Sequence, residues 1–185
     1  LLESVASTFN GLALEKGLTL LLEFNEPAKL DVLSDALRLR QMLFNLVSNA
    51  IKFTEVGHVK ISAIGKRVGS SSMHMRITVS DTGIGIPKSE QQRLFLPFSQ
   101  LRHTTDSSGS GLGLYITRSL CKLMGGTLSI RSKPNTGTSM VISLTVPLLQ
   151  SQSSTTQLIV ANSVMAPHKP MPSLHVLVVE DYALH

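Results

Sequence analysis

The sequence predicts a mixed α/β domain in which amphipathic helices are interleaved with short β-strands. Residues 35–53 give the clearest helical signal, because their apolar side chains recur at intervals of three and four residues. Residues 127–131 and 139–146 instead alternate polar with apolar side chains, as half-buried strands do. Apolar residues make up 42% of the chain and aromatic residues only 4%, so the expected core is aliphatic.

The composition limits the classes of partner. The formal net charge is +5, but the Lys and Arg residues are scattered, so the sequence does not predict nucleic-acid binding. A modest positive charge suits an anionic small ligand. The single cysteine, Cys121, excludes an internal disulfide and is compatible with a reducing compartment. The sequence contains no signal peptide and no long apolar run, and its abrupt ends predict a piece of a longer protein.

The first half of the chain predicts two helices and four strands. One helix covers residues 1–16 and ends at Gly17, and the other covers 35–53, with Asp35 at the N-cap or in the first turn. The predicted strands are 19–24, 30–33, 59–64 and 73–79. The run from Gly69 to Ser72 predicts a hairpin loop between the last two strands.

The second half predicts two more helices and two strands. A short helix runs from Pro87 to Arg93, because proline is tolerated at the first helical position. A longer helix runs from Gly111 to Met124 and stops at the next two glycines. The strands 127–131 and 139–146 flank a turn at Pro134–Gly137.

The composition changes near Pro147, which predicts the domain organisation. Residues 1–148 form the expected main domain. Residues 149–173 are rich in Ser, Thr, Gln and Pro, which is typical of a flexible linker. Residues 174–185 contain the apolar run Val176–Val179 followed by two acidic residues, which predicts the beginning of a buried strand.

Two glycine-rich motifs enclose the most informative stretch. The first is Asp81-Thr-Gly-Ile-Gly-Ile-Pro87, and the second is Gly109-Ser-Gly-Leu-Gly-Leu114. Between them lie an aromatic cluster, 94–98, and a polar run, 99–108. Glycine lets a backbone approach a ligand closely, so the pair predicts a nucleotide pocket with a mobile cover. The alternative is two ordinary turns flanking a surface loop.

The polar side of the helix 35–53 carries an unusual stripe of Gln41, Asn45, Asn49 and Lys52. Asn is a poor helix former, so two of them one turn apart cost the helix some stability. Their amide oxygens can both reach a bound cation, and Lys52 can reach a phosphate. The alternative is a solvated face, or Asn side chains that hydrogen-bond the backbone.

In their order and spacing, these motifs resemble the nucleotide-binding boxes of sensor histidine kinases. Asn45–Thr54 resembles the asparagine box, Asp81–Gly85 the first glycine box, Phe95–Phe98 the phenylalanine box and Gly109–Leu114 the second glycine box. The resemblance covers 1–148 and points to the catalytic ATP-binding domain, whose fold is shared with gyrase B, MutL and heat-shock chaperone ATPases. It implies a two-layer α/β sandwich, with a mixed, mostly antiparallel sheet covered on one face by helices, and an ATP lid.

The resemblance also implies the reaction and the partners. Such a domain binds Mg²⁺ and ATP and transfers the γ-phosphoryl group to a histidine on a dimerisation hairpin, in two-component signal transduction. None of the six histidines fits the pattern of that phosphoacceptor helix, so the nucleophile is expected outside this chain. Residues 176–181 resemble the start of a receiver domain, which implies a hybrid kinase that acts as a homodimer in a phosphorelay with a receiver domain or response regulator. The expected location is the cytoplasmic side of an inner-membrane sensor kinase.

The same resemblance assigns expected roles to individual residues. Asn49 would ligate Mg²⁺ with help from Asn45, and Lys52 would contact phosphate, so these three form the expected catalytic set. Asp81 would accept a hydrogen bond from the adenine amino group, with Thr138 nearby through water. The other expected nucleotide-binding residues are Gly83, Gly85, Ile86, Phe98, Arg102, Gly109, Gly111, Leu112, Gly113 and Leu114.

The chain departs from the family in its lid. The polar run is short, and Asp106-Ser107-Ser108 stands where a basic pair is usual, so Arg102 or His103 is the expected substitute. A degenerate module that binds a nucleotide or a partner without catalysis is the alternative function. A hydrolase of the gyrase or chaperone type is disfavoured, because those enzymes have Glu where this chain has Asn45, and an amide cannot take a proton from water. A dinucleotide site is disfavoured because a polar loop, rather than a strand, precedes Gly109.

Overall fold

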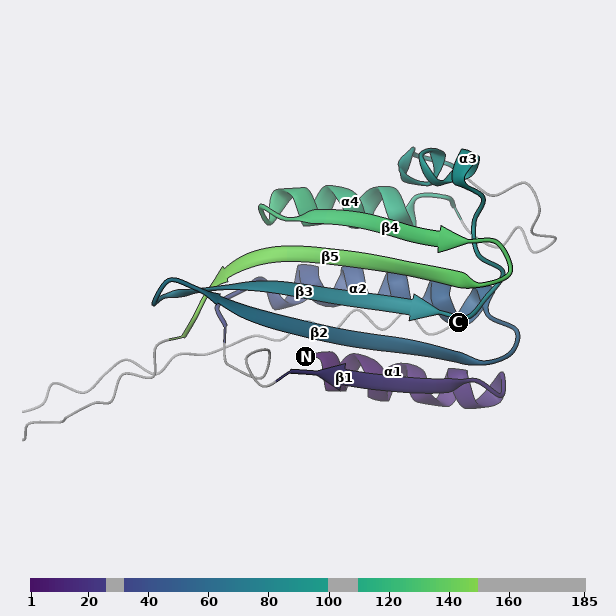
Figure 1. Cartoon of the computed structure of the whole chain (residues 1–185), viewed down its shortest axis with the longest axis horizontal. Helices are drawn as coiled ribbons and strands as arrows, with labels where there is room; N and C mark the ends of the chain where they lie inside the picture. The colour runs from purple at the N-terminus through teal and green to yellow at the C-terminus, as the bar shows by residue number, and fades with distance from the viewer. Residues whose placement is uncertain (26–31, 100–109, 150–185) are drawn as a thin grey trace, which may run out of the picture. The chain divides into compact units, whose positions relative to one another are not determined.

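The computed structural model describes residues 1–25, 32–99 and 110–149. They build a sheet of five strands with helices packed on it (Figure 1). The strands are β1 (Thr19–Phe24), β2 (His58–Val68), β3 (Ser72–Asp81), β4 (Thr127–Lys133) and β5 (Gly137–Pro147). The helices are α1 (Leu2–Glu15), α2 (Ala36–Phe53), α3 (Lys88–Gln91) and α4 (Gly113–Leu123), with a 3₁₀ turn, η2 (Arg93–Phe95).

The sheet is mixed, with the strand order β1-β2-β3-β5-β4. β1 runs parallel to β2, whereas the β2–β3, β3–β5 and β4–β5 pairs are antiparallel. A parallel pair needs a long crossover connection, and α2 lies within the one that joins β1 to β2. The predicted mixed, mostly antiparallel sheet is therefore confirmed.

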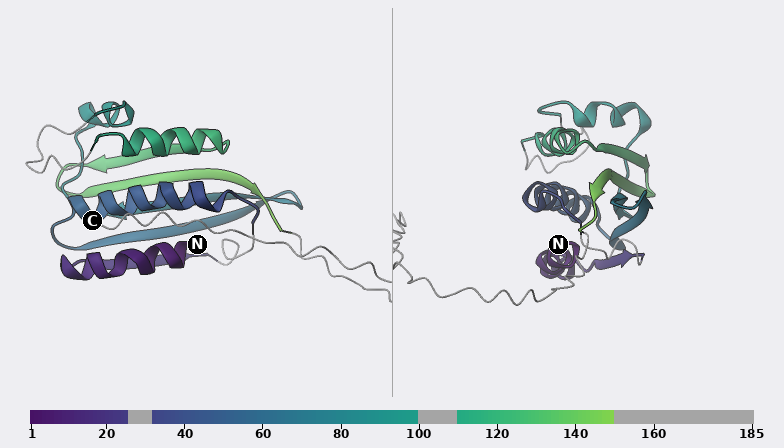
Figure 2. Two further views of the ribbon diagram at one scale, coloured as in Figure 1. Left: turned by 180° about the vertical axis from the view of Figure 1, so that it is seen from behind. Right: turned by 90° about the vertical axis from the view of Figure 1, so that its left-hand side faces the viewer.

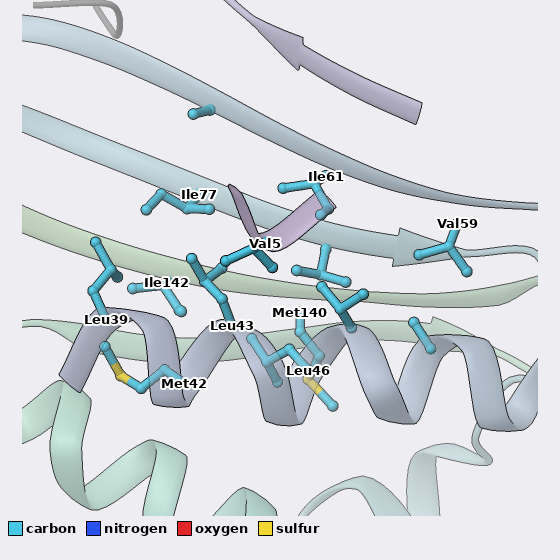
Figure 3. Packing of buried hydrophobic residues seen from close by; sticks show 14 of the residues in the cluster. Val5, Leu39, Met42, Leu43, Leu46, Val59, Ile61, Ile77, Met140 and Ile142 are labelled. Carbon is cyan, nitrogen blue, oxygen red and sulfur yellow. The ribbon is translucent and has the colours of Figure 1, made fainter. Parts of the chain in front are cut away.

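Helices α1, α2 and α4 lie on the same face of the sheet, which gives the two layers that were expected (Figure 2). Met42 and Leu43 of α2 are fully buried in one cluster with Ile61 and Ile142 of the sheet (Figure 3). Truncating a buried residue of this kind to Ala typically costs about 2–5 kcal/mol, so this cluster holds the two layers together.

Both ends of α2 are fixed by side chains. At its start, the backbone N–H of Arg38 donates to Oδ1 of Asp35 at 3.0 Å, which confirms Asp35 as the N-cap. At its end, Nζ of Lys16 donates to the carbonyl oxygens of Ile51 at 2.9 Å and Lys52 at 3.0 Å. The last carbonyls of a helix lack partners within it, and a cation suits the negative end of the helix dipole. Lys16 therefore ties α1 to the part of α2 that carries the polar stripe.

The structure corrects several predicted boundaries. Of the expected strand 30–33, residues 30 and 31 lie outside the described residues, and Val32 forms an isolated bridge with Leu148 rather than a strand. α4 begins at Gly113 instead of Gly111, because the φ of Gly111 is +68°, which a right-handed helix cannot accommodate. Pro87 is the N-cap of α3 and not its first helical residue.

Other expectations fall outside the described residues. These are the polar run from residue 100 to 108, and the linker and receiver-like segments from residue 150 onward. Within the described part of the chain, no helix has the length and apolar character needed to cross a membrane.

Candidate functional site

One end of the sheet brings together most of the predicted site residues. β3 and β4 end there at Asp81 and Lys133, and β5 begins there at Gly137 (Figure 1). The last turn of α2 reaches the same place, because the backbone N–H of Ile84 donates to the carbonyl oxygen of Phe53 at 3.3 Å. The first glycine motif is thereby anchored to the helix that carries Asn45, Asn49 and Lys52.

Asp81 is a half-buried carboxylate with a fixed orientation. Its Oδ1 accepts two hydrogen bonds, from the backbone N–H of Gly83 at 2.9 Å and of Thr138 at 3.1 Å. Its Oδ2 accepts no hydrogen bond from the described residues. Burial raises the pKa of Asp81 above its ordinary value, while the two backbone hydrogen bonds lower it. One carboxylate oxygen is thus held by the protein, and the other remains available to a donor from a ligand.

The glycines of the first motif are required by close packing against other backbone. A Cβ on Gly83 would lie 2.2 Å from the carbonyl oxygen of Phe53. A Cβ on Gly85 would lie 1.9 Å from the carbonyl oxygen of Lys133, and the φ of Gly85 is +66°. The neighbours that these glycines meet are protein atoms, so their first role is to let the loop fit between α2 and the β4–β5 turn. Ile86 follows them and is buried.

A polar network that the sequence did not reveal ties this loop to the β4–β5 hairpin. The backbone N–H of Ile86 donates to Oγ of Ser132 at 2.8 Å. Nε2 of Gln91 donates to the carbonyl oxygens of Ile86 at 2.9 Å and of Ser132 at 3.0 Å. Oγ of Ser132 also lies 2.8 Å from Oγ1 of Thr138. Ser132 and Thr138 face each other in the β4–β5 register, which the turn at Pro134–Gly137 could have indicated.

The two asparagines of α2 lie one turn apart with their amides side by side. Nδ2 of Asn49 is 3.5 Å from Oδ1 of Asn45, and Nδ2 of Asn45 donates to Oγ1 of Thr117 at 2.9 Å. The hydroxyl of Thr117 donates in turn to the carbonyl oxygen of Gly113 at 2.9 Å. Asn45 therefore joins α2 to α4 and does not lie on a solvated face. Thr117, which is fully buried, is a further residue that sequence reasoning missed.

The second glycine motif lies where α4 begins. Oδ1 of Asn45 approaches Gly113 so closely that a Cβ there would lie 2.2 Å from it. A Cβ on Gly111 would lie 2.8 Å from the carbonyl carbon of Phe98. Leu112 and Leu114 are partly buried on either side of Gly113. The motif thus connects the phenylalanine segment to the helix beside Asn45.

The remaining predicted site residues are Phe98, Lys52, Arg102, His103 and Gly109. Phe98 has a φ of +60° and is 74% exposed. Nζ of Lys52 lies 5.5 Å from the ring centroid of Phe53. Arg102, His103 and Gly109 lie outside the described residues, so their expected contacts stay predictions.

Comparison with known proteins gives three consistent results at the level of sequence. A family model described as histidine kinase-, DNA gyrase B- and HSP90-like ATPase matches residues 34–150. The virulence sensor protein BvgS of Bordetella bronchiseptica is 42% identical over 183 residues, which are 97% of this chain and 15% of that protein. The signal transduction histidine-protein kinase BarA of Escherichia coli K12 is 42% identical over 125 residues, 66% of this chain and 14% of that protein. The chain therefore spans only a small part of the length of these relatives.

Solved structures share the fold. A full-length structure of ShkA in complex with AMPPNP aligns with a TM-score of 0.69 and 30% identity, covering 80% of this chain and 30% of that one. The nucleotide-free catalytic domain of the histidine kinase ThkA aligns with a TM-score of 0.64 and 30% identity, covering 79% of this chain and 89% of that one.

Proposed function

This chain belongs to the family of histidine kinase-, DNA gyrase B- and HSP90-like ATPases, and we propose that it is the catalytic ATP-binding domain of a sensor histidine kinase. In this proposal it binds ATP with Mg²⁺ and transfers the γ-phosphoryl group to a histidine on a dimerisation hairpin outside this chain. The observation that carries the proposal is the carboxylate of Asp81, of which one oxygen is held by two backbone N–H groups and the other is left for a ligand.

Asp81 suits an adenine ring. The exocyclic amine of adenine is a donor that Oδ2 can accept, whereas the carbonyl at the same position of guanine is an acceptor that a carboxylate repels. Thr138 is paired with Asp81 in the β3–β5 register, which supports the proposal that its hydroxyl contacts the base through water. The structure of ShkA with AMPPNP, an ATP analogue, supports a nucleotide in this fold.

The polar stripe of α2 suits the metal and the phosphates. Among the described residues, no group of three His, Cys, Asp or Glu side chains could hold a metal ion. The amide oxygen of Asn49 accepts no hydrogen bond from the described residues, and that of Asn45 accepts one from Asn49, which leaves each with a lone pair for Mg²⁺ when the phosphates of ATP supply the negative ligands. A Mg²⁺ ion held there by Asn49 and Asn45 would neutralise phosphate charge, and Lys52 would contact a phosphate as a second cation.

The chemistry of Asn45 favours transfer to a protein group over hydrolysis. A general base for an attacking water needs a group that can take a proton, and an amide cannot. In this structure the Asn45 amide instead donates to Thr117 and bridges two helices. A non-catalytic module is the alternative function. The name of the relative BarA, a histidine-protein kinase, favours the catalytic one.

The wider proposal concerns the whole protein. The receiver-like start at 174–185, after the linker 149–173, supports a hybrid kinase with a main domain of 1–148. Its partners would be its own dimerisation hairpin in a homodimer and a receiver domain or response regulator. The domain would work on the cytoplasmic side of an inner-membrane sensor kinase.

Phosphoryl transfer gives a direct test. The chain is incubated with γ-labelled ATP, Mg²⁺ and a dimerisation hairpin supplied in trans, and the label on the hairpin is assayed for lability in acid, which identifies phosphohistidine. The expected result is label that requires both Mg²⁺ and Asn49. ATP binding without any transfer, with several relatives' hairpins supplied, would favour the non-catalytic module.

A further inference from the structure

Three paired residues form one row across the sheet at the candidate site. Asp81 of β3 is paired with Thr138 of β5, and Thr138 is paired in turn with Ser132 of β4. Directly paired residues project from the same face of a sheet. This is the helix-covered face, because Asp81 follows the buried Val79 at the two-residue spacing of a strand. Ser132 therefore projects from the same face of the sheet as Asp81, whose carboxylate is proposed to bind the base.

The hydrogen bonds of Ser132 determine where the hydrogen of Thr138 points. Oγ of Ser132 accepts from the backbone N–H of Ile86 at 2.8 Å and donates to the carbonyl oxygen of Gly137 at 3.0 Å. A serine hydroxyl carries one hydrogen, and the bond to Gly137 uses it. The 2.8 Å contact between Oγ of Ser132 and Oγ1 of Thr138 then requires the hydrogen of Thr138. Thr138 is left with lone pairs for any other neighbour.

We propose that Ser132 is a positioning residue that sets the preference for adenine over guanine, by holding the Thr138 hydroxyl as an acceptor. The inference rests on the proposed ATP site. The paired residues Asp81 and Thr138 would then both present lone pairs to the base, which suits an amine and repels the guanine carbonyl. Without the Ser132 hydroxyl, Thr138 can turn its hydrogen toward that carbonyl, directly or through water.

Gln91 provides a matched control within the same network. Its Nε2 holds the backbone of Ile86 and Ser132 together, yet it makes no hydrogen bond to either hydroxyl. Gln91→Met removes both donors at similar side-chain length and leaves the Ser132 hydroxyl in place. A loosened loop would weaken the binding of ATP and GTP alike, whereas a change in hydroxyl orientation would alter their ratio.

The test measures dissociation constants for ATP and for GTP, each with Mg²⁺, by displacement of a fluorescent ATP analogue from the full chain. The unmodified chain should prefer ATP. Ser132→Ala should reduce the preference for ATP over GTP by about tenfold, the worth of one hydrogen bond. Ser132→Thr, which keeps a hydroxyl, should restore the preference, and Gln91→Met should leave it unchanged. In a Thr138→Val background, Ser132→Ala should no longer alter the ratio.

The outcomes separate the two proposals. If the unmodified chain binds neither nucleotide, the proposed function fails. If it binds ATP selectively and Ser132→Ala leaves the ratio unchanged, or Gln91→Met lowers it equally, the role of Ser132 is wrong and the proposed function stands. If Ser132→Ala does not fold, as judged by circular dichroism, Ser132→Cys takes its place with the same expected direction, because a thiol is a weak acceptor.

Discussion

The amide of Asn45 donates to the hydroxyl of Thr117 across 2.9 Å, and this hydrogen bond joins the helix with the proposed metal ligands to α4. Thr117→Val keeps the shape of the side chain but removes the partner of a half-buried amide. Leaving such a group unsatisfied costs about 1–3 kcal/mol, so the free energy of unfolding should fall by roughly that amount. Denaturant unfolding measures it, with Thr117→Ser as the control that keeps the hydroxyl. A Thr117→Val variant that is as stable as the unmodified chain would show that the bond contributes nothing.

The proposed metal role of Asn49 predicts a difference between two forms of the ligand. Asn49→Ala should weaken the binding of ATP in the presence of Mg²⁺ far more than it weakens the binding of ATP with a chelator present. The reason is that an amide oxygen lost from the metal affects only the metal complex. Calorimetry with and without Mg²⁺ measures both affinities. Equal losses in the two conditions would exclude Asn49 as a ligand, and Gln41→Ala, on the same polar stripe, is the matched control.

Asp81 predicts a pH dependence of stability in the ligand-free chain. Burial raises the pKa of its carboxyl above the ordinary value of 3.8, so folding favours the protonated form. This contribution is therefore fully present below the ordinary value and is lost as pH rises through the raised pKa. The unfolding free energy of Asp81→Asn, relative to the unmodified chain, should accordingly increase as pH rises through this range and then level off. A relative stability that falls over the same range would contradict the raised pKa.

The same substitution, Asp81→Asn, should reduce the discrimination between ATP and GTP. An amide at residue 81 can turn its NH₂ toward a carbonyl, so the preference for ATP over GTP should decrease by roughly tenfold, as for a hydrogen bond to a charged group. Competition binding of the two nucleotides measures the ratio. If Asp81→Asn leaves the ratio of ATP to GTP affinity unchanged, Asp81 does not recognise the base.

The hydrogen bonds of Lys16 predict that its removal destabilises the chain, whereas removal of an exposed lysine elsewhere does not. Lys16→Met removes the two hydrogen bonds to the last carbonyls of α2 and should lower the free energy of unfolding by about 0.5–1.5 kcal/mol. Lys66→Met, at an exposed position of β2, is the control and should change stability little. If both variants unfold at the same temperature as the unmodified chain, Lys16 does not stabilise the end of α2.

The parts of the site that the sequence predicted are those with a local signature. The apolar periodicity of α2 placed Asn45, Asn49 and Lys52 on one helix, and the turn chemistry around Asp81 placed the first glycine motif after a strand. Thr117 and Gln91 escaped prediction because their partners, Asn45 and Ser132, are distant in sequence, whereas the pairing of Ser132 with Thr138 could have been inferred from the predicted turn. Gln91 and Ser132 are 41 residues apart, and only the sheet register and the packing of α3 on β4 bring them together. The start of α4 was misplaced by two residues because glycine leaves the direction of a turn open until the neighbouring backbone fixes it.

The family model begins at residue 34, yet the first helix belongs to the same core. Val5 is fully buried, the ring of Phe9 packs edge-on against that of Phe44 with centroids 5.1 Å apart, and Lys16 closes the end of α2. A recombinant fragment trimmed to the boundaries of the family model would therefore expose an apolar stripe on α2 and lose β1 from the edge of the sheet. Such a fragment would aggregate or lose affinity for reasons unrelated to its nucleotide chemistry, so expression of an isolated ATP-binding module from this protein should start no later than the first residue of α1.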